Sequence, residues 1–234
     1  MLQGPTWANI SDVHVGADDV GRLLADVRTI TGTERHVTWW LDPWCEPADL
    51  RERLRALGLA DPADRVPVVY RVRLDREPAP LPPGVEIRSV AAFEDFETAM
   101  QIAWEAFETP QERRRRDRPH LRANFDEQQK AGVPRTFIAS VDGEPAGVGR
   151  SVYGDGGVFL IAGAVLPSFR GRGVYRALVR ARWDDAVELG TPLLVTEANP
   201  ETSYPILKRL GFVDVCPVRR LEDPVQTGGS APAS

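Results

Sequence analysis

Apolar and polar residues alternate along this chain with two different periods. Apolar runs bounded by turn residues predict strands, and apolar residues three or four positions apart predict helices. The expected strands are residues 36–41, 66–74, 85–90, 135–141, 145–153, 158–165, 193–196 and 213–219. The expected helices are residues 48–57, 93–107, 111–130, 174–187 and 202–210. Strands that alternate with helices in this way predict an α/β protein.

Local residue patterns refine three of these elements. The helix over residues 93–107 is amphipathic, with Phe96, Met100, Ala103 and Phe107 expected on one face. Pro119 predicts a break in the helix that follows. The Asp-Gly pair at residues 142–143 lies between two strands, which is typical of a β-hairpin.

A proline-rich segment divides the chain. Four prolines fall within residues 75–84, where they remove backbone donors and disfavour helix. We therefore expect an N-terminal α/β segment over residues 1–75, a linker over 76–84 and a larger domain over 85–222. Residues 223–234 are rich in Gly, Ser, Ala and Pro, and we expect this tail to be disordered.

Composition and charge narrow the class of protein. The net charge is −5, which argues against a general nucleic-acid binder. The four arginines at residues 113–116 lie among acidic neighbours, and we interpret them as a solvated helix face, with contact to an acidic partner or to a nucleotide phosphate as the alternative. No apolar run approaches the ~20 residues that span a membrane, and the N-terminus lacks a signal-peptide pattern. We expect a cytoplasmic protein.

The cysteines and histidines of the chain suggest no metal chemistry. Cys45 and Cys216 show no metal-binding or redox spacing, so we expect two reduced, buried thiols and no metal site.

The segment over residues 163–176 carries the clearest chemistry. A buried strand ends before Pro167, a loop with Gly171 and Gly173 follows, and a helix begins at Val174. Free backbone N–H groups converge at a helix start, and the helix dipole favours negative charge there. A phosphate-bearing ligand is therefore expected at this loop.

We compared residues 170–175 with the motifs of three kinds of phosphate-binding loop, and they resemble one of them. A P-loop needs Lys-Ser or Lys-Thr after its last glycine, and Val174-Tyr175 follows here. A dinucleotide fingerprint needs a third glycine that is missing. The sequence Arg-Gly-Arg-Gly-Val-Tyr at residues 170–175 resembles the loop Arg/Gln-x-x-Gly-x-Gly/Ala of the GNAT superfamily of N-acetyltransferases, with Tyr175 in place of a small residue.

A second motif extends the resemblance. Residues 207–212, Leu-Lys-Arg-Leu-Gly-Phe, are similar to the Leu-Tyr-x-x-x-Gly-Phe helix end of that family, and the similarity covers residues 85–222. It implies a GNAT fold, in which a mixed central sheet is flanked by helices, preceded here by a smaller N-terminal α/β segment. It also implies acetyl-CoA as the co-substrate.

The resemblance assigns the residues that contact coenzyme A. In the family, the end of the central strand binds the pantetheine arm and the loop binds the diphosphate. Asn199 matches an asparagine that binds the pantetheine amides, with a helix cap or turn as its alternative role. The implied set is Gly163, Ala164, Val165, Arg170, Gly171, Arg172, Gly173, Val174, Tyr175, Arg176 and Asn199.

Two positions depart from the family's catalytic pattern. Phe159 stands where many members have a glutamate, and Leu207 stands where the usual acid is a tyrosine. Glu197, just after a strand, is the candidate base, with a solvated loop carboxylate as the alternative. Tyr204, one helical turn before Leu207, is the candidate acid, with packing against the core as the alternative.

The acceptor is expected to be an amine on a small molecule or a peptide. Trp104, Glu105, Phe107 and Tyr153 are the candidate cleft wall, although Trp104 and Phe107 equally fit core positions. The rival function is a non-catalytic acyl-CoA-binding regulatory module, which the missing glutamate and tyrosine favour. The sequence is compatible with a homodimer but does not predict one.

One internal similarity concerns the N-terminal segment. Residues 54–59, Leu-Arg-Ala-Leu-Gly-Leu, repeat the Leu-x-x-Leu-Gly-apolar step of residues 207–212 between a helix and a strand. This suggests a degenerate GNAT-like half, with chance similarity of two helix ends as the alternative. No glycine loop precedes the first copy, so we expect no coenzyme A binding there.

Overall fold

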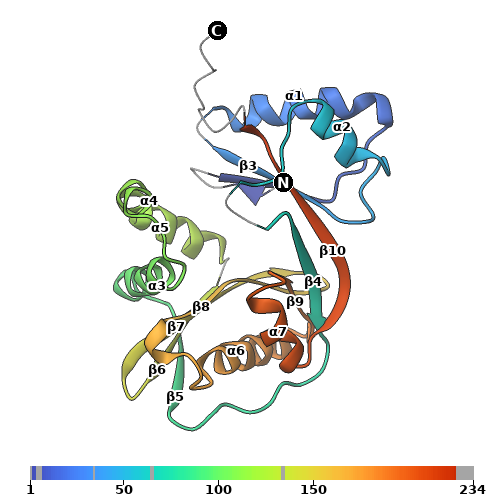
Figure 1. Cartoon of the computed structure of the whole chain (residues 1–234). Helices are drawn as coiled ribbons and strands as arrows, with labels where there is room; N and C mark the ends of the chain where they lie inside the picture. The colour runs from blue at the N-terminus through green and yellow to red at the C-terminus, as the bar shows by residue number, and fades with distance from the viewer. Residues whose placement is uncertain (1, 4–6, 34, 64–65, 133–134, 225–234) are drawn as a thin grey trace. The chain divides into compact units, whose positions relative to one another are not determined.

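The chain divides by its internal contacts into two units, each described here by itself (Figure 1). The computed structural model describes residues 2–3, 7–33, 35–63, 66–132 and 135–224. Unit 1 comprises Met1–Arg71, Ala198–Pro205 and Asp214–Ser234, and unit 2 comprises Val72–Glu197 and Ile206–Val213. Strand β4 (Val68–Leu74) and helix α7 (Ser203–Arg209) each contribute residues to both units.

Unit 1 is a small α/β layer built from both ends of the chain. Its strands lie in the order β1-β2-β3-β10, with β2 and β3 parallel and the other two pairs antiparallel. Trp39, Leu54 and Leu221 are fully buried in its core. The elements are β1 (Leu2–Gln3), β2 (Trp7–Ile10), the 3-10 turn Ala17–Asp19, α1 (Val20–Thr31), β3 (His36–Leu41), α2 (Leu50–Ala56) and β10 (Val213–Glu222).

Helix α1 was not expected from the sequence, although its buried side chains follow helical spacing. Val20, Leu24, Val27 and Thr31 face the core at intervals of three and four residues. The other positions hold Gly21, polar residues and further apolar residues, of which Leu23 packs at the edge of the core and Ile30 is exposed. The helical periodicity was therefore present in the sequence, and packing of this stripe against the sheet of unit 1 stabilises the helix.

The C-terminal strand is held in unit 1 by a buried ion pair. The sequence placed residues up to 222 in the larger domain, yet β10 pairs with β3 from Arg219 and Leu41 to Glu222 and Thr38. Asp223, expected in the tail, is fully buried and accepts two hydrogen bonds from Arg28, at 2.7 and 2.9 Å. The rest of the expected tail, residues 225–234, lies outside the described residues.

Two helices end with the same backbone geometry. Gly58 and Gly211 have φ angles of 101° and 95°, and the residue after each glycine donates its N–H to the carbonyl five positions earlier, at 3.1 Å in both cases. These are Schellman caps, which need a residue with positive φ. The shared sequence step therefore corresponds to a shared local structure.

Unit 2 is a mixed sheet covered by helices on both faces (Figure 1). Its strands lie in the order β9-β8-β7-β6-β5, with β8 and β9 parallel and the other pairs antiparallel. The elements are β5 (Val85–Ser89), α3 (Phe93–Ala106), α4 (Gln111–Asp117), the 3-10 turn Arg118–His120, α5 (Leu121–Ala131), β6 (Arg135–Val141), β7 (Glu144–Gly154), β8 (Gly157–Val165), the 3-10 turn Pro167–Phe169, α6 (Val174–Glu188) and β9 (Leu194–Ala198).

Alternating side chains of the sheet pack against different helices. Ile138 and Val148 belong to the apolar cluster that contains α3 and α5, whereas Phe137 and Ala139 belong to the cluster that contains α6. Successive residues of a strand point to opposite faces. The sheet of unit 2 therefore has an α3/α5 face and an α6 face, and each side chain can be assigned to one of them.

Most of the expected turns and breaks of unit 2 are present. Asp142 and Gly143 have φ angles of 53° and 82° and join β6 to β7, as the hairpin prediction required. The helix expected over residues 111–130 is interrupted at Arg118–His120. Phe107 departs from the prediction, because α3 ends at Ala106 and the Phe107 side chain is 55% exposed instead of packed.

Two smaller findings concern the whole described part of the chain. Cys45 and Cys216 are both buried and unbridged. None of the described helices has both the length and the apolar character that crossing a bilayer requires.

The buried ion pair of unit 1 predicts a large stability effect. Asp223→Ala removes two charge-assisted hydrogen bonds and leaves an Arg28 side chain that is 28% exposed and can be hydrated, so the free energy of unfolding should fall by about 1.5–3 kcal/mol. Asp75→Ala, which removes the half-exposed contact with Arg73, is the control and should cost less than about 1 kcal/mol. Urea denaturation of the full chain measures both, and equal effects would contradict the structural role of Asp223.

Candidate active site

The centre of unit 2 contains a bulge in strand β8. Val148 pairs with Ala164 and Arg150 pairs with Ile161, so Gly149 alone faces two residues of β8. One of these, Ala162, has a φ of 48°, which is unusual for a residue with a side chain. Bulges bend a strand and interrupt its ladder, and they are frequent beside active sites.

Strand β8 parts from β9 at this bulge. Among the described residues, their parallel pairing runs from Val158 and Leu194 to Leu160 and Thr196, where the Thr196 hydroxyl donates to the Leu160 carbonyl at 2.9 Å. Beyond Leu160, the β9-facing edge of β8 no longer takes part in that ladder. Its backbone groups as far as Val165 are therefore available to an extended ligand.

A loop with two glycines of positive φ follows β8 directly. Gly171 and Gly173 have φ angles of 78° and 82°, and α6 begins at Val174. The first bond of the helix runs from the Ala177 N–H to the Gly173 carbonyl, at 3.0 Å. The N–H groups before Ala177 lie at the positive end of the helix dipole, which is the geometry that binds phosphate oxygens.

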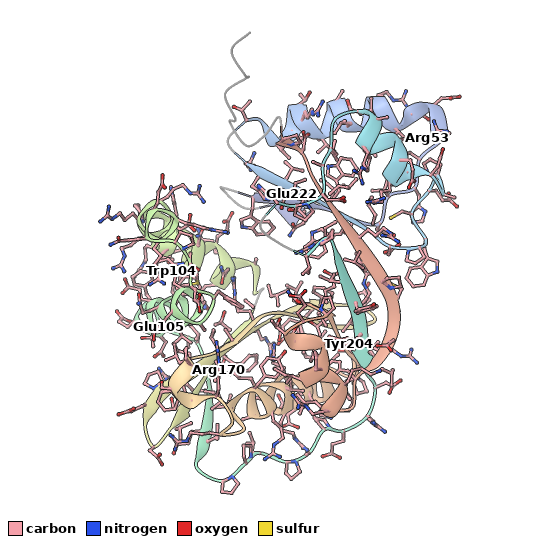
Figure 2. The ribbon with its side chains drawn as sticks, viewed as in Figure 1. Arg53, Trp104, Glu105, Arg170, Tyr204 and Glu222 are labelled. Carbon is pink, nitrogen blue, oxygen red and sulfur yellow. The ribbon has the colours of Figure 1, made fainter. Side chains whose placement is uncertain are left out.

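Three arginines surround this loop. Arg170 is exposed, Arg172 bonds Asp142 at 2.8 Å, and Arg176 has a buried Nε that makes no hydrogen bond (Figure 2 labels Arg170). Guanidinium groups bind phosphates in a bidentate manner. The loop and its arginines therefore have the donors that a diphosphate needs, and their assignment to coenzyme A stays a prediction.

Tyr175 packs inward instead of facing the loop. A Cβ placed on Gly163 would lie 2.9 Å from Cε2 of Tyr175, so the ring occupies the space above that glycine. Burial raises the pKa of the Tyr175 phenol. The large residue at the end of the loop motif is thus accommodated by a glycine in β8, and the backbone of the loop is not displaced by it.

Arg182 fills the neighbouring space on the α6 face. It is only 1% exposed, and a Cβ on Gly149 would lie 3.0 Å from its Cζ. Its Nε donates to the Leu178 carbonyl at 2.8 Å, and burial lowers the pKa of its guanidinium. Tyr175 and Arg182 together fill the space that Gly163 and Gly149 leave on the α6 face beneath the bulge.

Asn199 takes part in the turn after β9. Its Oδ1 accepts the N–H of Glu201 at 2.8 Å, and its own N–H donates to the Ser203 hydroxyl at 2.9 Å. These bonds match the turn role that was the alternative for this residue.

Glu197 lies at the end of β9, where β9 parts from β8. Thr196 faces α6 together with Leu160, so the alternation of β9 directs the half-buried Glu197 to the α3/α5 face. Phe159, at the position where relatives have a glutamate, lies opposite Val152 on the same face.

Tyr204 belongs to unit 1 by its contacts. Its hydroxyl donates to Oδ2 of Asp214 at 3.1 Å, and its ring lies 4.8 Å from the ring of Tyr70. The hydroxyl therefore donates its hydrogen bond to a carboxylate.

The four residues expected at the acceptor do not come together. Trp104 is buried in the α3/α5 cluster, whereas Glu105 and Phe107 are exposed (Figure 2 shows Trp104 and Glu105 on α3). Tyr153 lies on the α6 face, where its hydroxyl donates to Asp185 and burial together with Asp185 raises its pKa. The sheet therefore separates Tyr153 from the other three.

One charged residue of this region was missed by the sequence reasoning. Arg150 lies in the middle of β7, opposite Ile161 and beside the bulge. Its Nε is buried and makes no hydrogen bond. A lone arginine in an otherwise small and apolar strand was the available signal.

Comparison with known proteins agrees with this geometry. The sequence model of the acetyltransferase (GNAT) family matches residues 96–212. The chain belongs to the GNAT family. It is accordingly an acyltransferase, with the mixed sheet and flanking helices of GNAT proteins.

Solved GNAT structures are similar in fold over most of the chain. A GCN5-related N-acetyltransferase from Kribbella flavida has a TM-score of 0.67 and 22% identity, over 91% of this chain and 78% of that one. A tandem GNAT protein from the clavulanic acid biosynthesis pathway has a TM-score of 0.60 and 17% identity, over 93% and 73%. A GCN5-related N-acetyltransferase from Sphaerobacter thermophilus has a TM-score of 0.54 and 16% identity, over 88% and 68%. No match is found among curated proteins.

The contact between Tyr175 and Gly163 predicts a specific coupling. Gly163→Ala forces a Cβ against the Tyr175 ring, and overpacking of this kind lowers the free energy of unfolding by about 1–3 kcal/mol. In a Tyr175→Ala background the same change should cost less than about 1 kcal/mol. Gly156→Ala, where nothing lies within 4 Å, is the control. Chemical denaturation of the four chains completes the cycle, and equal costs in both backgrounds would refute the contact.

Proposed function

We propose that this GNAT protein transfers an acetyl group from acetyl-CoA to an amine of a small molecule or peptide. The observation that carries the proposal is the opening of β8 from β9 at the bulge, followed at once by a glycine loop and a helix start. An extended arm and a diphosphate need these two features in this order. The family resemblance supports acetyl-CoA as the donor.

The chain offers a specific group to each part of such a donor. Edge groups of β8 from Ala162 to Val165 fit the amides of the pantetheine arm. The N–H groups around Gly171 and Gly173, with Arg170 and Arg176, fit the diphosphate. A backbone N–H near Val165 is well placed to donate to a thioester oxygen, and a fixed donor there stabilises negative charge as it develops. The thioester supplies the acetyl group.

The amine must lose a proton before it attacks. An alkylamine with a pKa near 10.4 requires about 4–5 kcal/mol to be neutral at pH 7. Glu197 is the proposed base, because it ends β9 beside the opening and faces the α3/α5 side from which the acceptor approaches. A carboxylate there accepts the proton directly or through one water molecule.

The departing thiolate needs a proton or a positive environment. Tyr204 is the proposed acid, one helical turn before the position that carries a tyrosine in relatives. Its O–H donates to Asp214 in the structure, so the phenol must turn away from this carboxylate in order to protonate the thiolate. We propose that Asn199 also contacts the pantetheine arm, through its side-chain NH₂ group, because its Oδ1 and backbone N–H are used in the turn.

The N-terminal part is proposed to be a degenerate GNAT-like half, over residues 1–75. The matching Schellman caps at Gly58 and Gly211 support this, as does the fold similarity to a tandem GNAT protein. No glycine loop precedes a helix there, so we assign coenzyme A binding to unit 2 alone.

Coenzyme A binding is expected to depend on Gly173. Gly173→Val places a branched side chain at a φ of 82° and against Pro82, whose Cγ lies 3.0 Å from the Cβ position, so the loop must move. Most of the affinity measured by calorimetry should be lost. Gly190→Val imposes the same kind of strain at a φ of 74° on a residue that meets no neighbour, and it should keep wild-type affinity. Unchanged coenzyme A binding in Gly173→Val would contradict the site.

Turnover is expected to depend on Tyr204 and Glu197. Tyr204→Phe should lower kcat at least about tenfold with little change in coenzyme A affinity, because a positioned acid contributes about 10²–10⁴ in rate. Tyr70→Phe is the matched control, since it removes a neighbouring phenol from the same ring pair. Glu197→Gln should lower the rate mainly below about pH 8, where the amine is still protonated.

Thiol release from acetyl-CoA with a panel of amines measures these effects. Wild-type rates in both variants would mean that positioning alone carries the reaction. Coenzyme A binding without turnover of any amine would contradict the proposal and support the non-catalytic acyl-CoA-binding module.

A further inference from the structure

Arg150 is a half-buried cation without a counter-charge. Within the described part of the chain, no hydrogen bond or ion pair involves its guanidinium, and its Nε is shielded from solvent. Desolvation alone lowers its pKa to about 10, so no carboxylate offsets its burial. Arg135, on the neighbouring strand, shows the contrast, because it pairs with Asp185 on the α6 face.

A second polar group beside Arg150 is also unsatisfied. Thr136 of β6 is the direct cross-strand partner of Arg150, so both side chains lie on the α3/α5 face. Thr136 is 4% exposed, and its hydroxyl makes no hydrogen bond. Buried polar groups are nearly always satisfied in proteins, and two adjacent exceptions on one rung of the sheet point to a missing ligand.

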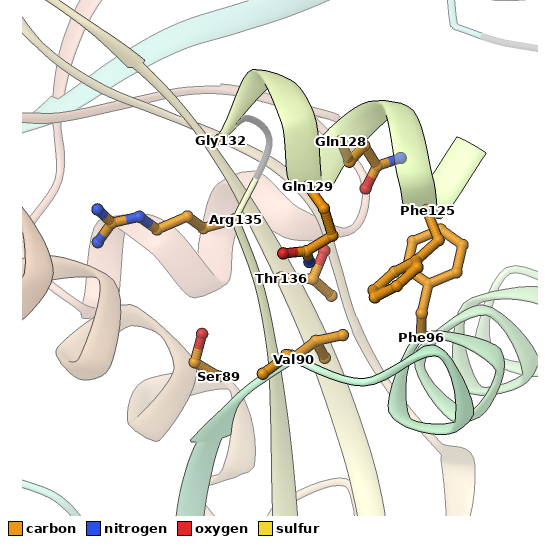
Figure 3. Close-up of a pocket in the computed structure, with 10 residues that line it drawn as sticks. Ser89, Val90, Phe96, Phe125, Gln128, Gln129, Gly132, Arg135 and Thr136 are labelled. Atoms are coloured by element: carbon orange, nitrogen blue, oxygen red, sulfur yellow. The ribbon is translucent and has the colours of Figure 1, made fainter. Parts of the chain in front are cut away.

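The same face contains a cavity of about 260 Å³ next to Thr136. It lies between β5, β6, α3 and α5, and Gln128 and Gln129 add side-chain amides to its lining. Figure 3 shows Gln129 reaching toward Thr136, with Phe96 and Phe125 together at one end of the cavity. The space is thus apolar on one side and lined with hydrogen-bonding groups on the other.

The position of Arg150 relates this region to the transfer site. It faces Ile161, the residue directly before the bulge at Ala162. Tyr175 and Arg182 fill the α6 face beside the bulge, so we take the acceptor to enter over the face that Arg150 occupies. An arginine one strand away from the reacting centre is within reach of a group a few bonds from the acceptor nitrogen.

We propose that Arg150 and Thr136 bind an acidic group of the acceptor, so that the substrate is an amine that also carries a carboxylate or a phosphate. The guanidinium donates two hydrogen bonds to the anion and the threonine hydroxyl donates a third. The acid thereby orients the amine toward β8 and satisfies both orphaned side chains. This inference rests on the acetyl transfer proposed above.

Paired acceptors test the substrate class on the full chain. The pairs are β-alanine with β-alaninamide, and O-phosphoethanolamine with ethanolamine, each assayed by thiol release from acetyl-CoA. The acidic member of one pair should have a kcat/KM at least about thirtyfold higher, because an anion on a desolvated arginine is worth that much. The pair that shows the preference identifies the anion as carboxylate or phosphate. Equal use of acidic and neutral members in both pairs overturns the proposal.

Variants test whether Arg150 is the source of the preference. Arg150→Met should remove the preference for the acid and leave the neutral acceptor within about threefold of wild type. Arg150→Lys keeps a charge and should restore part of the preference. Arg122→Gln removes a mostly exposed arginine of α5 and should keep it in full. Equal losses with acidic and neutral acceptors in Arg150→Met would make Arg150 a structural residue and overturn the proposal.

Thermal unfolding gives a readout that does not need turnover. Succinate or inorganic phosphate should raise the Tm of the wild type more than that of Arg150→Met, in which only the glycine loop remains to bind the anion. Without anions, Arg150→Met should have the higher Tm, because it removes an unpaired, half-buried charge. If no amine is acetylated but this anion effect is present, the proposed function fails and the anion site stands. If amines are acetylated and anions shift both chains equally, acetyl transfer stands and the anion site fails.

Discussion

The bulge in β8 is the constraint on which the centre of unit 2 depends. One extra residue at Ala162 turns the strand, ends its ladder with β9 at Leu160 and leaves backbone groups unpaired on that edge. Two glycines beside the bulge, one on each strand, leave room for side chains of α6. Gly149 leaves room for the Arg182 guanidinium and Gly163 leaves room for the Tyr175 ring, and both side chains come from α6. The same helix begins at the glycine loop, so the bulge, the loop and α6 pack against one another.

The two faces of that sheet differ in how their charged side chains are paired. On the α6 face, Tyr153 and Arg135 both contact Asp185, although Oγ of Ser151 and Nη2 of Arg182 make no hydrogen bond there. On the α3/α5 face, Arg150 has no counter-charge, and the Thr136 hydroxyl beside it makes no hydrogen bond with the described residues. The proposed acidic acceptor would supply the missing charge.

Elements and turns that depend on one continuous segment were predicted correctly from the sequence. The order strand, loop and helix over residues 158–187 follows from an apolar run, a proline, two glycines and a helical stripe, all within thirty positions of one another. The Asp142-Gly143 hairpin and the break at Pro119 depend on only a few residues each, and both are present. Phe107 was misplaced because its helix ends one residue earlier, and periodicity cannot locate an end to that precision.

Contacts between distant segments were out of reach. The sequence gives no sign that Asp223 meets Arg28, that β10 pairs with β3, or that Tyr153 faces Asp185, since each pair is separated by more than thirty residues. Helix α1 is a different case, because its buried residues recur at intervals of three and four and the sequence did carry this signal.

The sequence by itself determined the family, the loop and the order of the elements, because these depend on local glycines, prolines and apolar periods. Only the tertiary structure decided that Tyr175 packs on Gly163, that Arg182 fills one face, and that Arg150 lies without a counter-charge on the other. Register between strands sets which side chains share a face, and register is a property of paired segments. The sequence of one strand therefore does not show with which residues of another strand it pairs.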